Sequence, residues 1–356
     1  MTEPLIKIEG LYKLFGRHPE KVMALVESGK SKEQILNDTG HTLGLKNINL
    51  DIIQGEIFVI MGLSGSGKST LIRHFNRLID PTKGVVSVEG TDIIKLSPKQ
   101  LQDFRRHKMS MVFQNFGLMP HRSVIENVAY GLTVQGVSKQ RRLAKAQEWL
   151  DRVGLSGYQQ QYPAQLSGGE QQRVGLARAL CTDAEILLMD EAFSALDPLI
   201  RSEMQDQLIE LQQSLHKTII FITHDLDEAL RLGDRIAILK DGEVVQQGTA
   251  DDILLYPANA YVEAFVKNVN RARVLTVATI MQPTTHQITA ETVNQALAQI
   301  NKLKGDYAYH VNEDGYQGMV TQDSLELASK IQGDKSLTLS GYQDLLTLSP
   351  DATIET

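Results

Sequence analysis

The stretch IFVIMGLSGSGKSTL, residues 57–71, decides the fold of this chain. It begins with five consecutive apolar residues, which predict a strand that is buried on both faces. The strand leads directly into GLSGSGKS, residues 62–69, which matches the pattern G-x-x-x-x-G-K-[ST]. Glycines in this pattern permit a tight turn whose backbone amides point at phosphate oxygens. The stretch therefore predicts a phosphate-binding loop between a central strand and a helix.

The residue types of this loop predict how it holds a nucleotide. We expect Lys68 to neutralise the β- and γ-phosphates and Ser69 to ligate Mg²⁺. A helix over about residues 70–78 adds the partial positive charge of its N-terminal end. The alternative is a Gly- and Ser-rich turn without a ligand, which the apolar strand before it disfavours. The nucleotide-binding residues predicted here are Gly62, Ser64, Gly65, Ser66, Gly67, Lys68, Ser69 and Thr70.

Composition and charge limit the classes of protein to consider. The 356 residues suffice for two or more domains, and 42% hydrophobic with 22% charged residues is ordinary for a soluble globular protein. A net charge of −7 gives no basic footprint for nucleic acid, so we expect no nucleic-acid partner. No apolar run is long enough to span a membrane, and the start does not resemble a signal peptide. With the single Cys181, which permits no internal disulfide, these features predict a cytosolic chain.

The order of apolar runs predicts an α/β core with two insertions. Solid apolar runs at 186–189 and 219–222 alternate with helical patterns, which indicates a mixed sheet with a parallel centre. Residues 115–180 are mostly helical in pattern and predict a helical subdomain. Residues 17–43 form a polar interval in which SKEQ, residues 31–34, fits a capping box. We interpret this interval as an inserted helical hairpin, with a solvated decoration of no function as the alternative.

The N-terminal strand carries one aromatic residue of interest. Residues 5–9 alternate apolar and polar side chains in the manner of an edge strand. Phe15 follows shortly before Gly16, and its ring is suited to stacking on an adenine. An ordinary core phenylalanine is the alternative, because one aromatic residue alone does not establish a base-binding site.

LLMDE, residues 187–191, places two carboxylates at the C-terminal end of a buried strand. Ligands gather at this edge of open α/β sheets. We expect Asp190 to hold the magnesium shell and Glu191 to activate the attacking water as a general base. The alternative is that the two acids only cap the next helix.

LSGGE, residues 166–170, predicts a second anion site at the start of another helix. Ser167 is suited to be its N-cap, and Gly168 and Gly169 leave the backbone amides exposed at the positive end of the helix. Two phosphate sites on one chain make sense if one ATP is held by the phosphate-binding loop of one copy and by this helix end of another. The sequence therefore predicts a head-to-tail homodimer with two nucleotides between the copies.

The order of these motifs over about residues 5–266 resembles that of ATP-binding cassette (ABC) ATPases. It includes a glutamine after a strand, Gln114, and the strings SALD and THD at 194–197 and 223–225. The resemblance implies that Gln114 senses magnesium, water and the membrane partner, that His224 holds the γ-phosphate, and that Phe15 stacks on adenine. It also implies that the segment ending at Asp197 crosses the dimer interface. The catalytic residues so predicted are Glu191, His224, Lys68 and Gln114; the metal ligands are Ser69, Gln114 and Asp190; and Phe15, Ser167, Gly168, Gly169 and Asp197 join the nucleotide-binding set.

Longer strings resemble the ATPase subunits of glycine betaine/proline betaine importers. They are EIFVIMGL at 56–63, GLMPH at 117–121 and EAFSALDPLIR at 191–201, together with the insertion after Gly16. This resemblance implies a subunit that hydrolyses Mg-ATP at the cytoplasmic face of the plasma membrane and powers uptake of quaternary-amine osmoprotectants. Its implied partners are a second copy, transmembrane permease subunits and, indirectly, a periplasmic or extracellular substrate-binding protein.

Other functions fit the same residues to different degrees. Choline, carnitine or another compatible solute is the main alternative for the transported substrate. A soluble ABC ATPase of DNA repair or translation is more remote, because this chain has one cassette and an acidic balance. A non-hydrolytic nucleotide sensor is disfavoured by the presence of Lys68, Asp190, Glu191 and His224.

The predicted domain boundary lies near residue 270. We expect a nucleotide-binding domain over 1–270 and a small α+β region over 271–356 that resembles a cystathionine β-synthase (CBS) module. The elements expected in this module are an apolar segment at 277–281, a helix over 291–303, and strands over 307–311 and 316–321. Residues 348–354 resemble the start of a second module. Such modules usually work in pairs, so both a regulatory tail and a purely structural tail fit the sequence.

Overall fold

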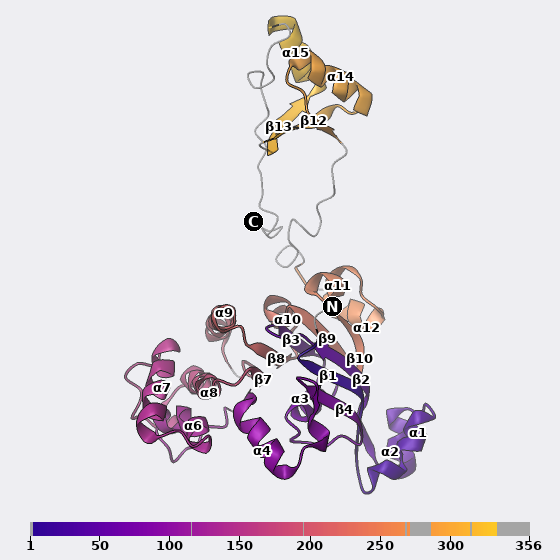
Figure 1. Ribbon diagram of the computed structural model, residues 1–356. Helices are drawn as coiled ribbons and strands as arrows, with labels where there is room; N and C mark the ends of the chain where they lie inside the picture. The colour runs from indigo at the N-terminus through magenta and orange to yellow at the C-terminus, as the bar shows by residue number, and fades with distance from the viewer. Residues whose placement is uncertain are drawn as a thin grey trace. The chain divides into compact units, whose positions relative to one another are not determined.

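The computed structural model describes residues 3–114, 116–194, 196–267, 269–270, 286–313 and 315–332. The chain forms two compact units, Met1–Val269 and Asn270–Thr356 (Figure 1). Within the described part of the chain, no helix has the length and apolarity that crossing a membrane requires.

The centre of the first unit is a six-stranded sheet in the order β10-β9-β3-β8-β7-β6. Five strands run parallel, and β10 pairs antiparallel to β9. All residues of β3, β7 and β8 are buried, as their unbroken apolar runs predict for strands covered on both faces. The predicted mixed sheet with a parallel centre is confirmed. The strands are β3 (Ile57–Met61), β6 (Met109–Val112), β7 (Ile186–Asp190), β8 (Thr218–Thr223), β9 (Arg235–Lys240) and β10 (Glu243–Gly248).

A second, antiparallel sheet has the order β2-β1-β4-β5. Its strands are β1 (Ile6–Phe15), β2 (Thr42–Ile52), β4 (Lys83–Val88) and β5 (Thr91–Asp92). The expectation of an edge strand at residues 5–9 is wrong, because β1 pairs with both β2 and β4. The alternating pattern of β1 reflects one buried face rather than an edge position, since its inward residues join the core shared with β3 and β8.

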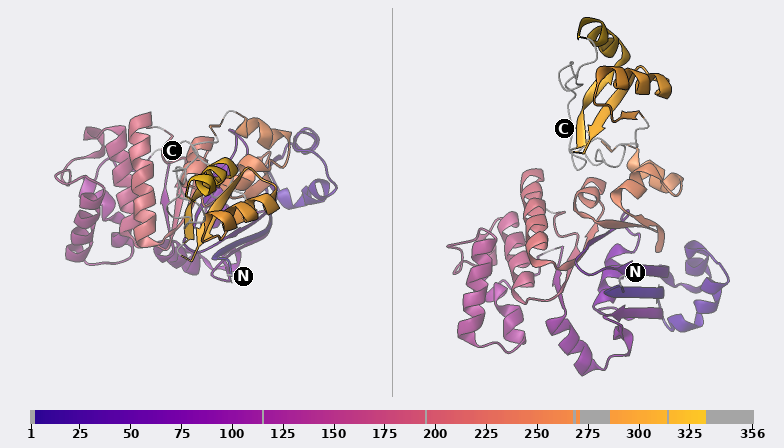
Figure 2. Two further views of the ribbon diagram at one scale, coloured as in Figure 1. Left: turned by 90° about the horizontal axis from the view of Figure 1, so that it is seen from above. Right: turned by 45° about the horizontal axis from the view of Figure 1, so that its top comes forward.

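Some helices of this unit pack against the two sheets, and others form a separate group beside them. The helix after β3, α3 (Lys68–Phe75), buries Leu71, Ile72 and Phe75 in the core common to both sheets. Helices α5 to α8 pack against one another to one side of the six-stranded sheet (Figures 1 and 2). The helices that follow α3 in this unit are α4 (Pro98–His107), α5 (Val124–Val128), α6 (Tyr130–Val134), α7 (Lys139–Arg152), α8 (Gly168–Cys181), α9 (Pro198–Leu215), α10 (Leu226–Leu232), α11 (Ala250–Leu255) and α12 (Ala260–Val266), with 3₁₀ turns η2 (Ile93–Lys95) and η3 (Pro163–Gln165).

The interval between β1 and β2 forms a small helical insertion. It contains η1 (Pro19–Lys21), α1 (Met23–Glu27) and α2 (Lys32–Thr39). The predicted capping box is present: the Ser31 hydroxyl accepts the Gln34 backbone N–H, and the Gln34 side chain accepts the Ser31 N–H. Val26 and Ile35 pack with Leu14 of β1 and Leu43 of β2 in a core of their own. The insertion is therefore anchored on the first two strands.

The described part of the second unit is a small α+β fold. It comprises β11 (Gln287–Ile288), α14 (Val293–Leu303), β12 (Tyr307–Asn312), β13 (Gly315–Thr321) and α15 (Gln322–Gln332). β11 pairs parallel to β12, and β12 pairs antiparallel to β13. The segments predicted at 277–281 and 348–354 lie outside the described residues, and the likeness to a CBS module stays a prediction.

Candidate active site

The phosphate-binding loop follows the C-terminal end of β3, and two of its glycines are required by space. At Gly62, φ is +156° and a Cβ atom would lie 2.3 Å from the carbonyl oxygen of Leu239. At Gly67, φ is +107° and a Cβ atom would lie 2.8 Å from the carbonyl oxygen of Gly44. No side chain fits at either position without displacing backbone. The glycines therefore permit the tight turn that leads from β3 into the start of α3, as the sequence predicts.

Lys68 is held on the inner side of this loop. Its Nζ donates to the carbonyl oxygens of Gly62 at 2.8 Å and Leu63 at 3.1 Å, and lies 3.6 Å from Oε1 of Glu191. The side chain is 4% exposed. Burial lowers the pKa of the Lys68 ammonium, and the negative charge of Glu191 opposes that shift. A positive charge is thus fixed beneath the loop before any nucleotide binds.

Ser69 and Asp190 come together from α3 and the end of β7. The Ser69 hydroxyl donates to Oδ1 of Asp190 at 2.9 Å, and Arg73 Nη2 lies 3.8 Å from Oδ2. Burial raises the pKa of the Asp190 carboxyl, and the hydrogen bond from Ser69 partly counters this. A cation placed beside this carboxylate would relieve the cost of its burial.

Glu191 lies where the ends of three parallel strands meet. Gln114, just after β6, donates from Nε2 to Oε2 of Glu191 at 3.2 Å. Nδ1 of His224, just after β8, lies 3.5 Å from the same oxygen. Glu191 itself has φ +46°, a left-handed conformation that is uncommon for a residue with a side chain. The strand order therefore joins Gln114, Glu191, His224 and Lys68 in one cluster, although they are distant in sequence.

A cavity of about 410 Å³ opens above this cluster. Phe15, a residue that is 40% exposed, lies at its wall, and a Cβ atom on Gly44 would come within 2.7 Å of its ring. The lining residues are Phe15, Lys32, Thr42, Leu43, Gly44, Ser64, Gly65, Gly67, Lys68, Ser69, Thr70, Gln114 and Glu191. The predicted residues Asp190 and His224 do not line the cavity, but Asp190 contacts Ser69 and His224 lies 3.5 Å from Glu191. Gly62 and Ser66 belong to the loop but do not line the cavity, and Ser66 is 6% exposed.

Four of the lining residues were not predicted from the sequence: Lys32, Thr42, Leu43 and Gly44. Their place depends on the pairing of β1 with β2, which sets Phe15 opposite Thr42. A helical insertion separates the two strands, so no local pattern reveals that they are partners. The polar capping box at Ser31 was the only signal close to Lys32, and it predicts a helix start rather than a ligand contact.

The remaining predicted residues lie around a second cavity of about 750 Å³. Ser167, Gly168, Gly169 and Asp197 line it, and none of them lines the first cavity. The Ser167 hydroxyl accepts the Glu170 N–H at 3.3 Å and so caps α8, as predicted. Asp197 caps α9 by accepting the N–H of Ile200 at 3.1 Å. Within one chain, then, the two predicted phosphate sites are separate.

Comparison with known proteins decides the family. A family profile described as ABC transporter matches residues 45–194. The glycine betaine transport ATP-binding protein OpuAA of Bacillus subtilis is 57% identical over 277 residues, which is 78% of this chain and 66% of that protein. The glycine betaine/proline betaine transport system ATP-binding protein ProV of Escherichia coli is 50% identical over 91% of this chain and 82% of its own length. The chain belongs to the ABC transporter ATP-binding proteins. It falls in their glycine betaine/proline betaine group, as the sequence predicts.

Solved structures share the fold of this cassette. A dimeric, post-hydrolysis structure of the ATP-binding cassette MJ0796, bound to ADP and Pi, is 34% identical and matches with a TM-score of 0.59 over 69% of this chain and 98% of that one. CbiO1 from Clostridium perfringens, described as part of the ABC transporter complex cbiONQ, is 27% identical with a TM-score of 0.60 over 72% of this chain and 93% of that one. The predicted fold class is confirmed, as is the prediction of an ATP-binding ABC ATPase.

Proposed function

We propose that this cassette binds Mg-ATP in the first cavity and hydrolyses it to power import of a quaternary-amine osmoprotectant, glycine betaine or proline betaine. The observation that supports hydrolysis is the position of Glu191, which lies within 3.6 Å of Lys68, Gln114 and His224. The substrate class rests on the relatives, because a cytoplasmic ATPase subunit does not itself bind the solute. Carnitine stays the alternative, since the 57% identical GbuA of Listeria monocytogenes is named for glycine betaine and carnitine.

The residues around Ser69 and Asp190 fit a magnesium ion. Mg²⁺ prefers oxygen ligands and is usually bound through one or two carboxylates together with water and substrate phosphates. The Ser69 hydroxyl and Asp190 carboxylate, 2.9 Å apart, supply two such oxygens, and the Gln114 side chain supplies a third candidate. The bound ion supplies neutralisation of phosphate charge, which the single buried Lys68 cannot provide alone.

The other residues of the cluster act on the attacking water and the γ-phosphate. Glu191 accepts the proton of the water as general base, and Gln114 and His224 hold its carboxylate in position through their contacts to Oε2. Lys68 stabilises charge on the β- and γ-phosphates, and Phe15 stacks on the adenine at the other end of the cavity.

A second copy of the chain completes each site. In the second cavity, Ser167 to Gly169 form a helix end that suits an anion, and Asp197 lines the same cavity at the start of α9. They lie apart from the first cavity within one chain, so a head-to-tail dimer is the arrangement that brings both sets onto one nucleotide. The 34% identical MJ0796 cassette is described as dimeric and bound to ADP and Pi, which supports a nucleotide-binding dimer.

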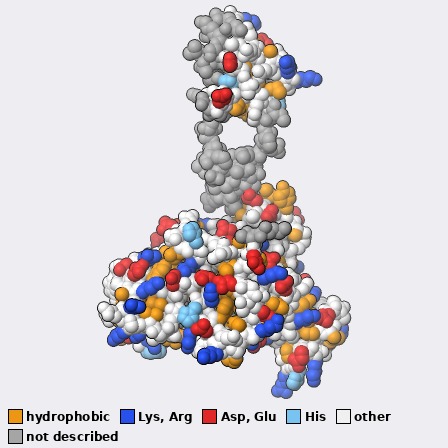
Figure 3. All heavy atoms as spheres, viewed as in Figure 1, with side chains coloured by type: hydrophobic (Ala, Val, Ile, Leu, Met, Phe, Trp, Pro, Cys, Tyr) orange, Lys and Arg blue, Asp and Glu red, His pale blue; other side chains and the backbone are white. Residues whose placement is uncertain are grey.

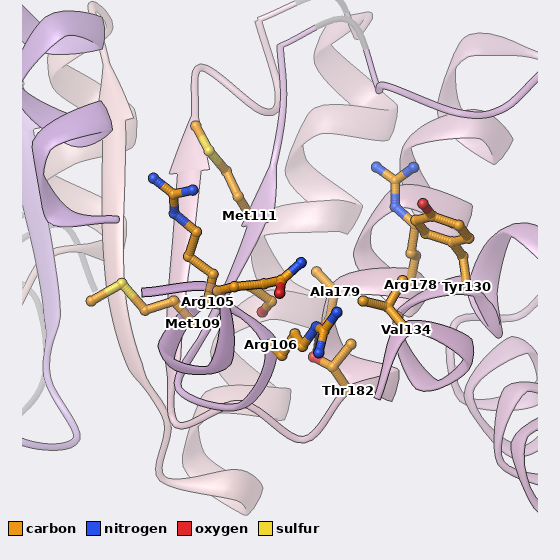
Figure 4. A pocket seen from close by; sticks show the side chains of 12 residues that line it. Arg105, Arg106, Met109, Met111, Tyr130, Val134, Arg178, Ala179 and Thr182 are labelled. Atoms are coloured by element: carbon orange, nitrogen blue, oxygen red, sulfur yellow. Dashed lines mark hydrogen bonds between the residues drawn. The ribbon is translucent and has the colours of Figure 1, made fainter. Parts of the chain in front are cut away.

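A third cavity, of about 350 Å³, is where we place the transmembrane permease subunits. Figure 4 shows Met109, Met111 and Arg105 on one side of it and Tyr130, Val134 and Arg178 on the other. Arg178 donates to the carbonyl oxygens of Gly117 at 2.5 Å and Phe116 at 2.7 Å, which fixes the backbone just after Gln114. A permease segment bound in this apolar and basic cavity could shift Arg178 and the backbone that it holds. That shift would change the nearby contact between Gln114 and Glu191.

We propose that the permease subunits hold the chain at the cytoplasmic face of the membrane, with the substrate-binding protein as an indirect partner. Nucleic acid is not expected as a partner, and on the face drawn in Figure 3 the basic and acidic side chains are interspersed.

ATP-driven uptake tests the proposed function. In vesicles that contain this chain with its permease and substrate-binding subunits, labelled glycine betaine should accumulate only with ATP inside, and Glu191→Gln should abolish accumulation. Hydrolysis without glycine betaine uptake would remove the substrate assignment and keep the ATPase. Unchanged uptake by Glu191→Gln would contradict the coupling to hydrolysis at this site.

Phe15→Ala should raise the KM for ATP about tenfold, because stacking of a base on an aromatic ring is worth about 1–3 kcal/mol. The kcat should change little, since we assign Phe15 to the base and the Glu191 cluster to the γ-phosphate. Steady-state hydrolysis over a range of ATP concentrations measures both constants. Phe15→Trp should keep the low KM, and Tyr256→Ala, which removes an exposed ring outside the cavity, is the matched control. An unchanged KM in Phe15→Ala would count against base stacking.

A further inference from the structure

Lys32 lines the nucleotide cavity, yet it belongs to the helical insertion and not to any of the predicted nucleotide-binding motifs. It is the first residue of α2, and its side chain is half-buried. It shares the cavity wall with Phe15, Thr42, Leu43 and Gly44, which belong to the paired strands β1 and β2. The insertion thus contributes a cation to the site.

The insertion holds Lys32 in a fixed position. Ile35, one turn along α2, is fully buried between Leu14 and Leu43, and Leu43 itself lines the cavity. His41 ties the two ends of the insertion together, because its Nε2 lies 2.8 Å from the Arg17 carbonyl oxygen and its Nδ1 lies 2.9 Å from that of Thr39. A side chain on so anchored a helix loses little entropy when it contacts a ligand.

The charge of Lys32 is not compensated by the protein. Its ammonium makes no hydrogen bond or ion pair with any other residue that the structure describes. The neighbouring Lys30, in contrast, pairs with Asp38 at 2.6 Å, and Lys13 donates to the Asp80 carbonyl oxygen at 2.7 Å. An unpaired cation at the wall of a cavity that receives a polyanion is suited to pair with that ligand.

We propose that Lys32 binds the α-phosphate of the nucleotide, so that the insertion is part of the binding site rather than a solvated decoration. This inference rests on the proposed function of the first cavity. Phe15 and Lys68 fix the direction of the nucleotide, with the base at one end and the β- and γ-phosphates at the other. The α-phosphate is the phosphate nearest to the base, and Lys32 belongs to the insertion that begins directly after Phe15, the residue we assign to the base.

If Lys32 contacts the α-phosphate, ATP and ADP make the same contact with it, because both nucleotides carry that phosphate. Residues around the γ-phosphate distinguish ATP from ADP, whereas a contact to the α-phosphate binds both equally. Lys32 therefore adds to the affinity for either nucleotide without adding to the rate of the chemical step.

The experiment compares Lys32→Gln with Lys30→Gln in the full-length chain. The two variants remove the same charge from the same insertion, but only Lys32 lines the cavity. Lys32→Gln should raise the KM for ATP and the inhibition constant of ADP by the same factor, about fivefold, with kcat within about twofold of wild type. Lys30→Gln should match wild type, and Lys32→Arg should recover most of the affinity. The factor should shrink as the salt concentration rises, because salt screens a partly exposed charge contact.

Three outcomes would overturn the assignment. Equal nucleotide affinities of Lys32→Gln and Lys30→Gln would remove Lys32 from the site. A loss of ATP affinity without a loss of ADP affinity would place the contact beyond the α-phosphate, and a factor independent of salt would exclude a charge contact. Thermal melting of each variant shows whether the insertion stays folded. A wild-type chain that neither binds nor hydrolyses ATP would overturn the proposed function first, whereas normal wild-type turnover with unchanged Lys32→Gln removes only this inference.

Discussion

Glu191→Gln should reduce steady-state ATP hydrolysis by about a thousandfold while ATP binding persists. A positioned general base contributes about 10²–10⁴ to the rate, and Glu191 is the carboxylate that Lys68, Gln114 and His224 surround. Glutamine keeps the shape of the side chain and one acceptor oxygen but cannot accept the proton of water at neutral pH. Phosphate release measures turnover, and equilibrium titration with ATP measures binding.

Binding should persist because the substitution removes a repulsive charge. Without nucleotide, Oε1 of Glu191 lies 3.6 Å from Lys68 and partly balances its ammonium. When phosphates occupy the cavity, that carboxylate repels them, so a neutral amide should hold ATP at least as well. We therefore expect Glu191→Gln with ATP to accumulate as a dimer, which size-exclusion chromatography with light scattering detects. Glu263→Gln, an exposed acid of α12, is the matched control. Robust steady-state turnover by Glu191→Gln would falsify its role as the base.

The sequence predicts those parts of the site in which the functional residues directly follow a recognisable apolar strand. The loop at 62–69 follows an apolar strand, and the acids Asp190 and Glu191 follow another. Parallel strands in one sheet present their C-terminal ends at one edge, so these motifs had to meet once both strands were assigned to the same sheet. The Ser69–Asp190 hydrogen bond is a direct result of that topology.

Other parts depend on pairings that the sequence does not display. That β1 lies between β2 and β4 in a sheet of its own is a matter of long-range pairing, and its alternating pattern alone does not distinguish edge from centre. The contribution of Lys32 depends on the fold of the insertion over β1 and β2. The left-handed backbone of Glu191 has no local signal either, because glutamate rarely adopts it without tertiary support.

Lys68→Ala should weaken ATP binding about 100-fold. The ammonium stabilises two phosphates in a site where it is only 4% exposed, and hydrogen bonds to charged groups are worth about 1.5–3 kcal/mol even before the wider field of a buried charge is added. Titration calorimetry with ATP and magnesium measures the dissociation constant. Thermal melting of the apo protein checks the fold, because the substitution leaves the Gly62 and Leu63 carbonyl oxygens without this donor and Glu191 without its cation.

Arginine at this position separates the effect of charge from the effect of geometry. The ammonium of Lys68 fits between the carbonyl oxygens of Gly62 and Leu63 at 2.8 and 3.1 Å, a space for a compact charge that can donate in several directions. A guanidinium is planar and larger, so Lys68→Arg should keep the charge and still lose most of the affinity. Lys32→Arg is expected to behave in the opposite way, since Lys32 is only half-buried at the cavity wall and is not enclosed by carbonyl oxygens as Lys68 is. If Lys68→Ala binds ATP within about threefold of wild type, the loop does not hold the nucleotide through this lysine. If Lys68→Arg restores binding, charge alone suffices there and the close fit around the ammonium is not required.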